Sequence, residues 1–82
     1  MTHQEAFRRW LADNPLAQYR FVHNMGRLRT AALLGVSDTT IKAWEAGASA
    51  PSPEHLSRFE RLDAALPQQW QDWLAKKPGE AA

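Results

Sequence analysis

The most constraining feature of this chain is the segment AALLGVSDTTIKAWEAG, residues 31–47, which predicts two short helices separated by a tight break. Its first four residues are good helix formers, and Gly35 can take the left-handed conformation that ends a helix at no side-chain cost. Ser37 is a residue type that caps a new helix, and Gly47 is placed to end it. Two helices joined by so short a turn form a helix-turn-helix.

The second helix of this pair, expected over residues 37–46, has two different faces. Ile41, Trp44 and, more weakly, Ala48 keep the three-to-four-residue spacing of a helical stripe that packs on a core. The opposite face is polar or small and carries Asp38, Thr39, Lys42 and Ala43. This second face is therefore free to meet a partner.

The segments before this pair also read as short helices. Thr2 and Glu5 have the spacing of a capping box, which predicts a helix over about residues 3–12. Asn14 as cap and Pro15 at the first helical position predict a second helix, ending near residue 24. A third helix is expected to open at Arg27, after the break at residues 25–26.

After Gly47, Ser52 and Pro53 have the residue types that start a helix, which is expected to run to about Leu66 with Arg58 and Arg61 on its outer side. Pro67 is expected to break this helix, and residues 68–76 can form a last one. The fold class predicted is all-α: one domain, residues 1–82, folded as a compact bundle of five to six short helices. Its parts are a core over residues 15–66, an N-terminal helix within residues 1–14 and a C-terminal helix within residues 67–77.

Composition bounds the function. No Cys is present, and the three His residues show no metal-ligand spacing, so no metal site, catalytic residue or small-molecule cofactor is expected. No apolar run approaches the roughly 20 residues that cross a bilayer, which favours a cytoplasmic protein without membrane contact. The net charge is only +1, which is weak for a nucleic-acid binder unless the basic residues cluster.

The segments LLGVS (33–37), TTIKAWEAG (39–47) and PSPEHLSRF (51–59) together resemble the helix-turn-helix family of phage Cro and C1 repressors and their bacterial relatives. The resemblance can be extended back to Pro15. It implies a DNA-binding domain of the lambda-repressor type, with residues 37–46 as the recognition helix in the major groove of double-stranded DNA.

Several side chains of that helix have the chemistry to read bases. Thr39 and Ala43 can offer methyl groups to thymine, and Lys42 can donate to guanine. Asp38 can accept from cytosine N4 or serve only the helix dipole. Ser37 and Thr40 suit phosphate contacts or capping.

The third helix adds two further candidates, Arg27 and Arg29. The resemblance implies that Arg27 stands where relatives commonly place a Gln that reaches a phosphate or a base edge. The alternative for both Arg side chains is a solvated charged face. Thr30 departs from the family, which usually has an apolar residue there, so either Leu28 has turned inward or the helix is slightly re-registered.

The resemblance also implies an ion pair between Arg20 and Glu45 that would fix the angle of the recognition helix. The alternative is two separate surface charges, worth about 0–1 kcal/mol even if they touch. A second departure is the loop at residues 48–50, Ala-Ser-Ala, where many relatives carry cations that grip the phosphate backbone.

Trp70, Trp73 and Leu74 share a face of the last predicted helix and allow two interpretations. They can pack against the first helix and close the bundle. They can also form a dimer contact, because aromatic residues anchor interfaces and dimeric helix-turn-helix proteins bind two half-sites.

The function predicted is a small transcriptional regulator of phage or bacterial type, most simply a repressor, that binds double-stranded DNA and could act as a homodimer. One alternative is a helix-turn-helix scaffold used as a protein-interaction module, which the low net charge and the uncharged loop favour. Another is the DNA-recognition part of a phage or mobile-element complex.

Overall fold

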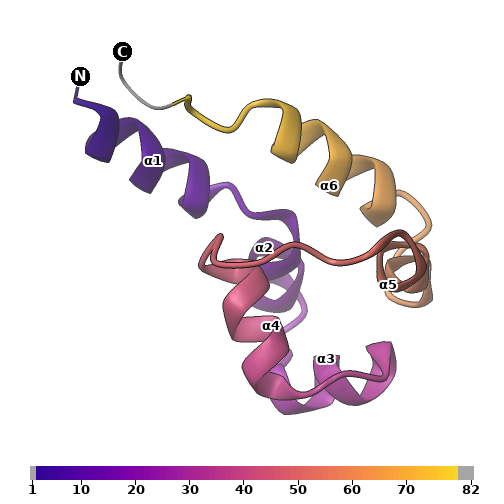
Figure 1. Cartoon of the computed structure of the whole chain (residues 1–82). Coiled ribbons are helices and arrows are strands. Elements are labelled where there is room, and N and C mark those ends of the chain that lie inside the picture. The colour runs from indigo at the N-terminus through magenta and orange to yellow at the C-terminus, as the bar shows by residue number, and fades with distance from the viewer. Residues whose placement is uncertain (1, 80–82) are drawn as a thin grey trace.

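A computed structural model describes residues 2–79, which form six α-helices and one short 3₁₀ helix and contain no strand (Figure 1). The elements are α1 (His3–Ala12), α2 (Pro15–Val22), α3 (Arg27–Leu34), α4 (Asp38–Glu45), α5 (Pro53–Arg58), the 3₁₀ helix η1 (Phe59–Arg61) and α6 (Leu66–Ala75). The all-α prediction is confirmed, and the helix-turn-helix is formed by α3 and α4.

Four of these helices begin at the side-chain caps that the sequence predicted. In each, a side-chain oxygen accepts a hydrogen bond from a backbone N–H three residues later, over 3.0–3.2 Å. The capping residues are Thr2, Asn14, Ser37 and Ser52. Each cap satisfies an N–H that has no partner within its own helix, so the starts of α1, α2, α4 and α5 are encoded locally.

The core is organised around a row of aromatic side chains. Phe59 of η1 is completely buried and lies between Trp44 of α4 and Trp70 of α6. Its ring centroid is 5.7 Å from that of Trp44 and 5.4 Å from that of Trp70, the latter in an edge-to-face arrangement. This row ties the helix-turn-helix to the C-terminal helix through large apolar surfaces.

Two Trp residues join α1 to α6, which lie side by side in Figure 1. The rings of Trp10 and Trp73 stack with centroids 3.8 Å apart. Each indole N–H also donates to the other residue's carbonyl oxygen, over 2.7 Å from Trp10 and 2.6 Å from Trp73. Both polar ends of the pair are therefore satisfied inside the chain.

This packing corrects the expectation of a dimer contact on α6. Trp70 and Trp73 are only 1% and 5% exposed in the single chain, and Leu74 is half-buried against the same core. The interpretation in which these residues close the bundle against the first helix is the one that the structure supports. The two Trp side chains have no free surface to offer a second copy.

The prediction of one continuous helix over residues 53–66 is also wrong, because the α-helix that begins there is shorter. It stops at Arg58, continues as the single turn of η1, and gives way to a turn in which the Asp63 carboxylate accepts from Ala65 N over 2.8 Å. Asp side chains compete in this way with helical hydrogen bonding. Pro67 does not break a helix but lies in the first turn of α6, where its missing N–H costs nothing.

Gly47, directly after α4, makes the first testable prediction. Its φ is +73°, and a Cβ built there would lie 3.3 Å from side-chain atoms of Trp10 and Leu11. We expect Gly47→Ala to lower the free energy of unfolding by about 1–2 kcal/mol, because L-residues pay for the left-handed conformation and α1 must move outward. Urea unfolding measures this. Gly79→Ala, at a position with open space, is the matched control, and equal stability of the two variants would contradict the prediction.

Candidate nucleic-acid interface

The turn between α3 and α4 is built from three residues with separate tasks. Gly35 adopts φ +71° and ends α3, and Val36 is half-buried and packs against the core at the corner. Ser37 then caps α4, with its Oγ 3.1 Å from Thr40 N. The sequence therefore fixes both the end of one helix and the start of the next within three residues.

The α4 helix presents the two faces that the sequence predicted. Ile41 and Trp44 are 0% and 3% exposed and belong to the core. On the other side Asp38, Thr39 and Lys42 are exposed and Ala43 is half-buried. Ala48 is exposed, so its expected place on the buried stripe is wrong, because the chain turns at Gly47 before reaching it.

The hydroxyls of Ser37 and Thr40 are used mainly within the cap. Besides accepting from Thr40 N, Ser37 Oγ lies 2.9 Å from Thr40 Oγ1, so the two hydroxyls bond to each other. One hydroxyl proton of the pair is left for an outside acceptor. Of the two roles considered for Ser37 and Thr40, capping is the one whose hydrogen bonds are present in the structure.

Arg27 and Arg29 are both exposed on α3. Thr30, whose inward position raised the question of register, is completely buried, and its Oγ1 donates to Gly26 O over 3.0 Å. Leu28 is 74% exposed. The expectation that Leu28 turns inward or the helix shifts is wrong: Thr30 fills the apolar position because its hydroxyl is satisfied by the preceding turn.

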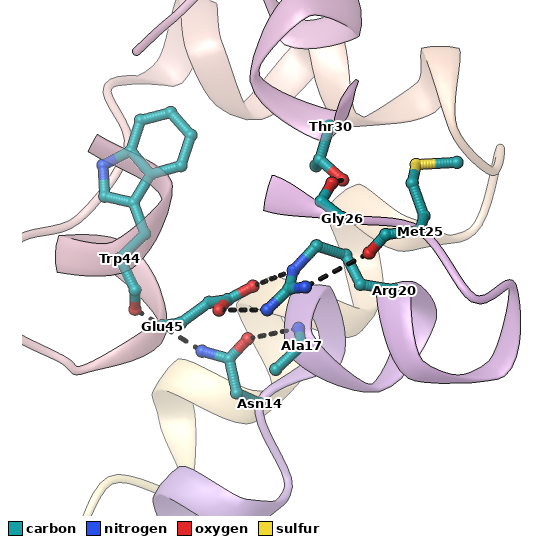
Figure 2. Close-up of polar contacts among 8 residues, drawn as sticks. All are labelled: Asn14, Ala17, Arg20, Met25, Gly26, Thr30, Trp44 and Glu45. Carbon is teal, nitrogen blue, oxygen red and sulfur yellow. Dashed lines mark hydrogen bonds and ion pairs between the residues drawn. The ribbon is translucent and has the colours of Figure 1, made fainter. Parts of the chain in front are cut away.

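Arg20 and Glu45 form a bidentate ion pair between α2 and the end of α4 (Figure 2). Arg20 Nε lies 2.6 Å from Glu45 Oε2, and Arg20 Nη2 lies 2.7 Å from Glu45 Oε1. Arg20 Nη1 also donates to Met25 O over 3.2 Å, in the turn that leads into α3. One guanidinium thus links α2, the entry to α3 and the C-terminus of α4.

The hydrogen bonds that Arg20 donates to Glu45 raise the pKa of Arg20 above its ordinary value, against the opposing effect of burial. Since the folded-state pKa is the higher one, the stabilisation from this group is fully present below the ordinary Arg pKa. It is lost only as the pH rises through the raised value. The Arg20 guanidinium therefore stays protonated and positively charged at all pH values near neutrality.

Asn14 makes a further link that its role as a cap did not predict. This fully buried side chain caps α2 with its Oδ1, and its Nδ2 lies 3.4 Å from Trp44 O, a long hydrogen bond (Figure 2). Glu45 is the next residue, so the C-terminal end of α4 is held at two adjacent positions. A buried Asn predicts that a partner exists, but not which carbonyl it is.

Arg58 and Arg61 were expected to lie on the outer side of their helix, and of the two only Arg61 is exposed. Arg58 is partly buried, and both donate to main-chain carbonyl oxygens of α3, over 3.2 and 3.1 Å respectively. No local pattern could have found these bonds, because they join residues 24 and 28 positions apart.

Charge is distributed unevenly along the chain. Residues 14–37 contain three Arg and no acidic residue, although the whole chain carries only +1. Arg27 and Arg29 in this segment and Lys42 on α4 are all exposed, whereas Arg20 is paired with Glu45. The loop at residues 48–50 is exposed and uncharged. Within the helix-turn-helix, three exposed cations thus stand against one exposed acid, Asp38.

Comparison with known proteins agrees with this geometry. Residues 27–62, from the start of α3 to the turn after η1, match the family described as Helix-turn-helix. The matched segment is a helix-turn-helix of the Cro/C1 type. No curated protein and no solved structure matches the chain.

Domains of this type bind double-stranded DNA, with the second helix of the pair in the major groove. In this chain that helix is α4, and the matched segment includes α5 and η1 as well as the two helices of the motif. Among residues 2–79, no helix is long and apolar enough to cross a membrane, and no cluster of three or more His, Asp or Glu side chains could hold a metal ion.

Proposed function

We propose that this protein is a sequence-specific double-stranded DNA-binding protein that acts as a small transcriptional regulator, with α4 in the major groove. The observation that carries the proposal is the exposed polar face of α4, held by buried Ile41 and Trp44 within a helix-turn-helix of the Cro/C1 type. An α-helix fits the major groove, where each base pair presents a distinct pattern of donors, acceptors and methyl groups.

Each side chain on the outer face of α4 has a proposed role that follows from its chemistry. Lys42 donates to guanine, Thr39 and Ala43 place methyl groups against thymine, and Asp38 either accepts from cytosine N4 or serves the helix dipole. The remaining proposed contacts are to phosphates and position the helix without reading sequence. They come from Arg27, Arg29, Ser37 and Thr40.

The regulatory role proposed is repression by occupancy, in which the bound protein excludes polymerase from its site. A homodimer would bind two half-sites about one helical turn apart. Since Trp70 and Trp73 are buried within the chain, a second copy would have to use another surface.

Selection of bound duplexes from a random library at about 150 mM salt tests the proposal. We expect one enriched motif, and we expect Lys42→Ala to relax a single position of it, with a loss of about 1–3 kcal/mol of discrimination there. The selection is repeated with this variant, and the base preferences are compared position by position. A palindromic motif indicates a dimer, and a single half-site indicates a monomer or a larger assembly.

Lys76→Ala is the matched control, because Lys76 is an exposed Lys beyond the end of α6 and its removal changes the net charge equally. If both Lys variants weaken binding to all sequences alike, Lys42 contacts phosphate and does not read a base. If the wild-type protein enriches no sequence motif and its binding to DNA disappears at modest salt, the proposal of sequence-specific DNA binding is wrong.

A second candidate, the protein-interaction module, is favoured by the apolar surface at the C-terminal end of α2. Phe21 and Val22 are 88% and 74% exposed, and they line one hollow together with Ala12 and Ala17. Exposed apolar side chains in a cluster are typical of interaction sites. A failed duplex selection together with an intact fold would support this candidate in place of the regulator.

A further inference from the structure

The C-terminus of α3 is satisfied in an unusual way. The last four carbonyl groups of a helix have no partner within the helix. Here Ala31 O accepts from Val36 N over 3.0 Å, and Ala32 O accepts from Gly35 N over 3.4 Å. These bonds are the ordinary consequence of a left-handed residue at the helix end. They leave the carbonyl groups of Leu33 and Leu34 to be satisfied by other groups.

Two Arg side chains take these remaining positions. Arg58 Nη1 donates to Leu34 O over 3.2 Å, and Arg61 Nη1 donates to Leu33 O over 3.1 Å. Since α3 has no basic residue in its own last turn, these cations also supply the positive charge that stabilises a helix C-terminus. All four carbonyl groups at the end of α3 are therefore satisfied.

Both Arg side chains can reach the same helix end because η1 packs against α3. Side chains three residues apart lie on the same side of a helix, and in a 3₁₀ helix they are eclipsed. Arg58 directly precedes η1, and Arg61 is its last residue.

The bonded carbonyl groups lie immediately before the turn that leads into α4. A Cβ at Gly35 would be 3.1 Å from Arg58 Nη1, so the guanidinium is packed directly against the turn. Arg58 Nη2 also pairs with Glu54 over 3.0 Å, which orients the group from α5. The turn is thus held from outside the two helices that it connects.

We infer that Arg58 and Arg61 are positioning residues for DNA recognition, which fix the angle between α3 and α4 by bonding the end of α3. This inference rests on the function proposed above and adds two residues that do not touch DNA. Their cations serve the protein's own carbonyl groups. Removing one should disturb how α4 presents its exposed face while leaving the number of phosphate contacts unchanged.

The test uses Arg61→Ala, because Arg61 is exposed and its removal leaves the core intact. Binding to the selected duplex and to an unrelated duplex is measured over a range of salt, at a temperature where circular dichroism shows a fully folded variant. We expect about tenfold weaker binding to the selected duplex, unchanged binding to the unrelated one and an unchanged salt slope. Arg61→Lys keeps a cation and should recover part of the affinity.

Arg8→Ala is the matched control, because Arg8 is an exposed Arg of α1 and its loss changes the net charge equally. A salt slope that falls by about 1 in Arg61→Ala, with both duplexes weakened alike, would mean that Arg61 contacts phosphate and would overturn the inference. Unchanged affinity of the folded variant would also overturn it.

A second readout does not depend on DNA. In the free protein, Arg61→Ala should shift the amide resonances of the turn, residues 35–37, and of α4 more than Arg8→Ala does. Resonances of α4 that stay in place would refute the positioning role. If the wild type proves to bind no DNA specifically, the proposed function fails, and these resonances still decide whether Arg61 fixes the turn.

Discussion

Phe59→Ala is expected to lower the free energy of unfolding by about 3–5 kcal/mol, the usual cost of removing a buried aromatic ring. Phe59 is completely buried and packs on Trp44 of α4 and Trp70 of α6. Its removal leaves a cavity between the helix-turn-helix and the C-terminal helix. Because small domains are stable by only about 5–15 kcal/mol in total, the variant should be largely unfolded at temperatures that the wild type tolerates.

The measurement is urea or thermal unfolding followed by circular dichroism and by Trp fluorescence. Phe21→Ala offers a closely matched control, since it removes the same ring from a side chain that is 88% exposed. It should change stability by no more than about 0.5 kcal/mol. Similar losses for the two variants would show that Phe59 does not form the centre of the core.

Arg20→Ala is expected to lower the free energy of unfolding by about 2–3 kcal/mol. This lies between the value for an exposed ion pair and the about 3–5 kcal/mol for breaking a fully buried one. The two side chains are 19% and 13% exposed, so solvent screens the pair only in part. The variant leaves Glu45 without its bidentate partner and removes the bond to Met25 O. We expect the end of α4 to become less ordered as a result.

A double-mutant cycle with Glu45→Ala separates the ion pair from the other effects of each substitution. We expect a coupling energy above about 1 kcal/mol, because the two hydrogen bonds are short and charge-assisted. The pair between Glu54 and Arg58 serves as the comparison, because Glu54 is 77% exposed, and Glu54→Ala should cost no more than about 0.5 kcal/mol. A coupling energy near zero for Arg20 and Glu45 would mean that the pair contributes little to the angle of α4.

Much of the helix-turn-helix could be predicted because its information is local. The caps at Ser37 and Ser52 and the left-handed conformation of Gly35 depend on residues within about four positions of each other. The buried and exposed faces of α4 follow from the helical repeat. The partners Arg20 and Glu45 came from resemblance to a family, since spacing alone does not identify a contact across 25 residues.

The tertiary structure decided everything that depends on which elements meet. Whether Trp73 faced α1 or a second copy could not be read from its apolar character, because both surroundings bury an indole ring equally well. The bond from Thr30 to Gly26 O spans only four residues, but packing decided that Thr30 and not Leu28 faces the core. The sequence did not show that Arg58 and Arg61 donate to the end of α3, because that depends on the packing of η1 against α3. Helix starts and turns are set by hydrogen bonds within a few residues, whereas the choice among distant partners is made by packing of the whole chain.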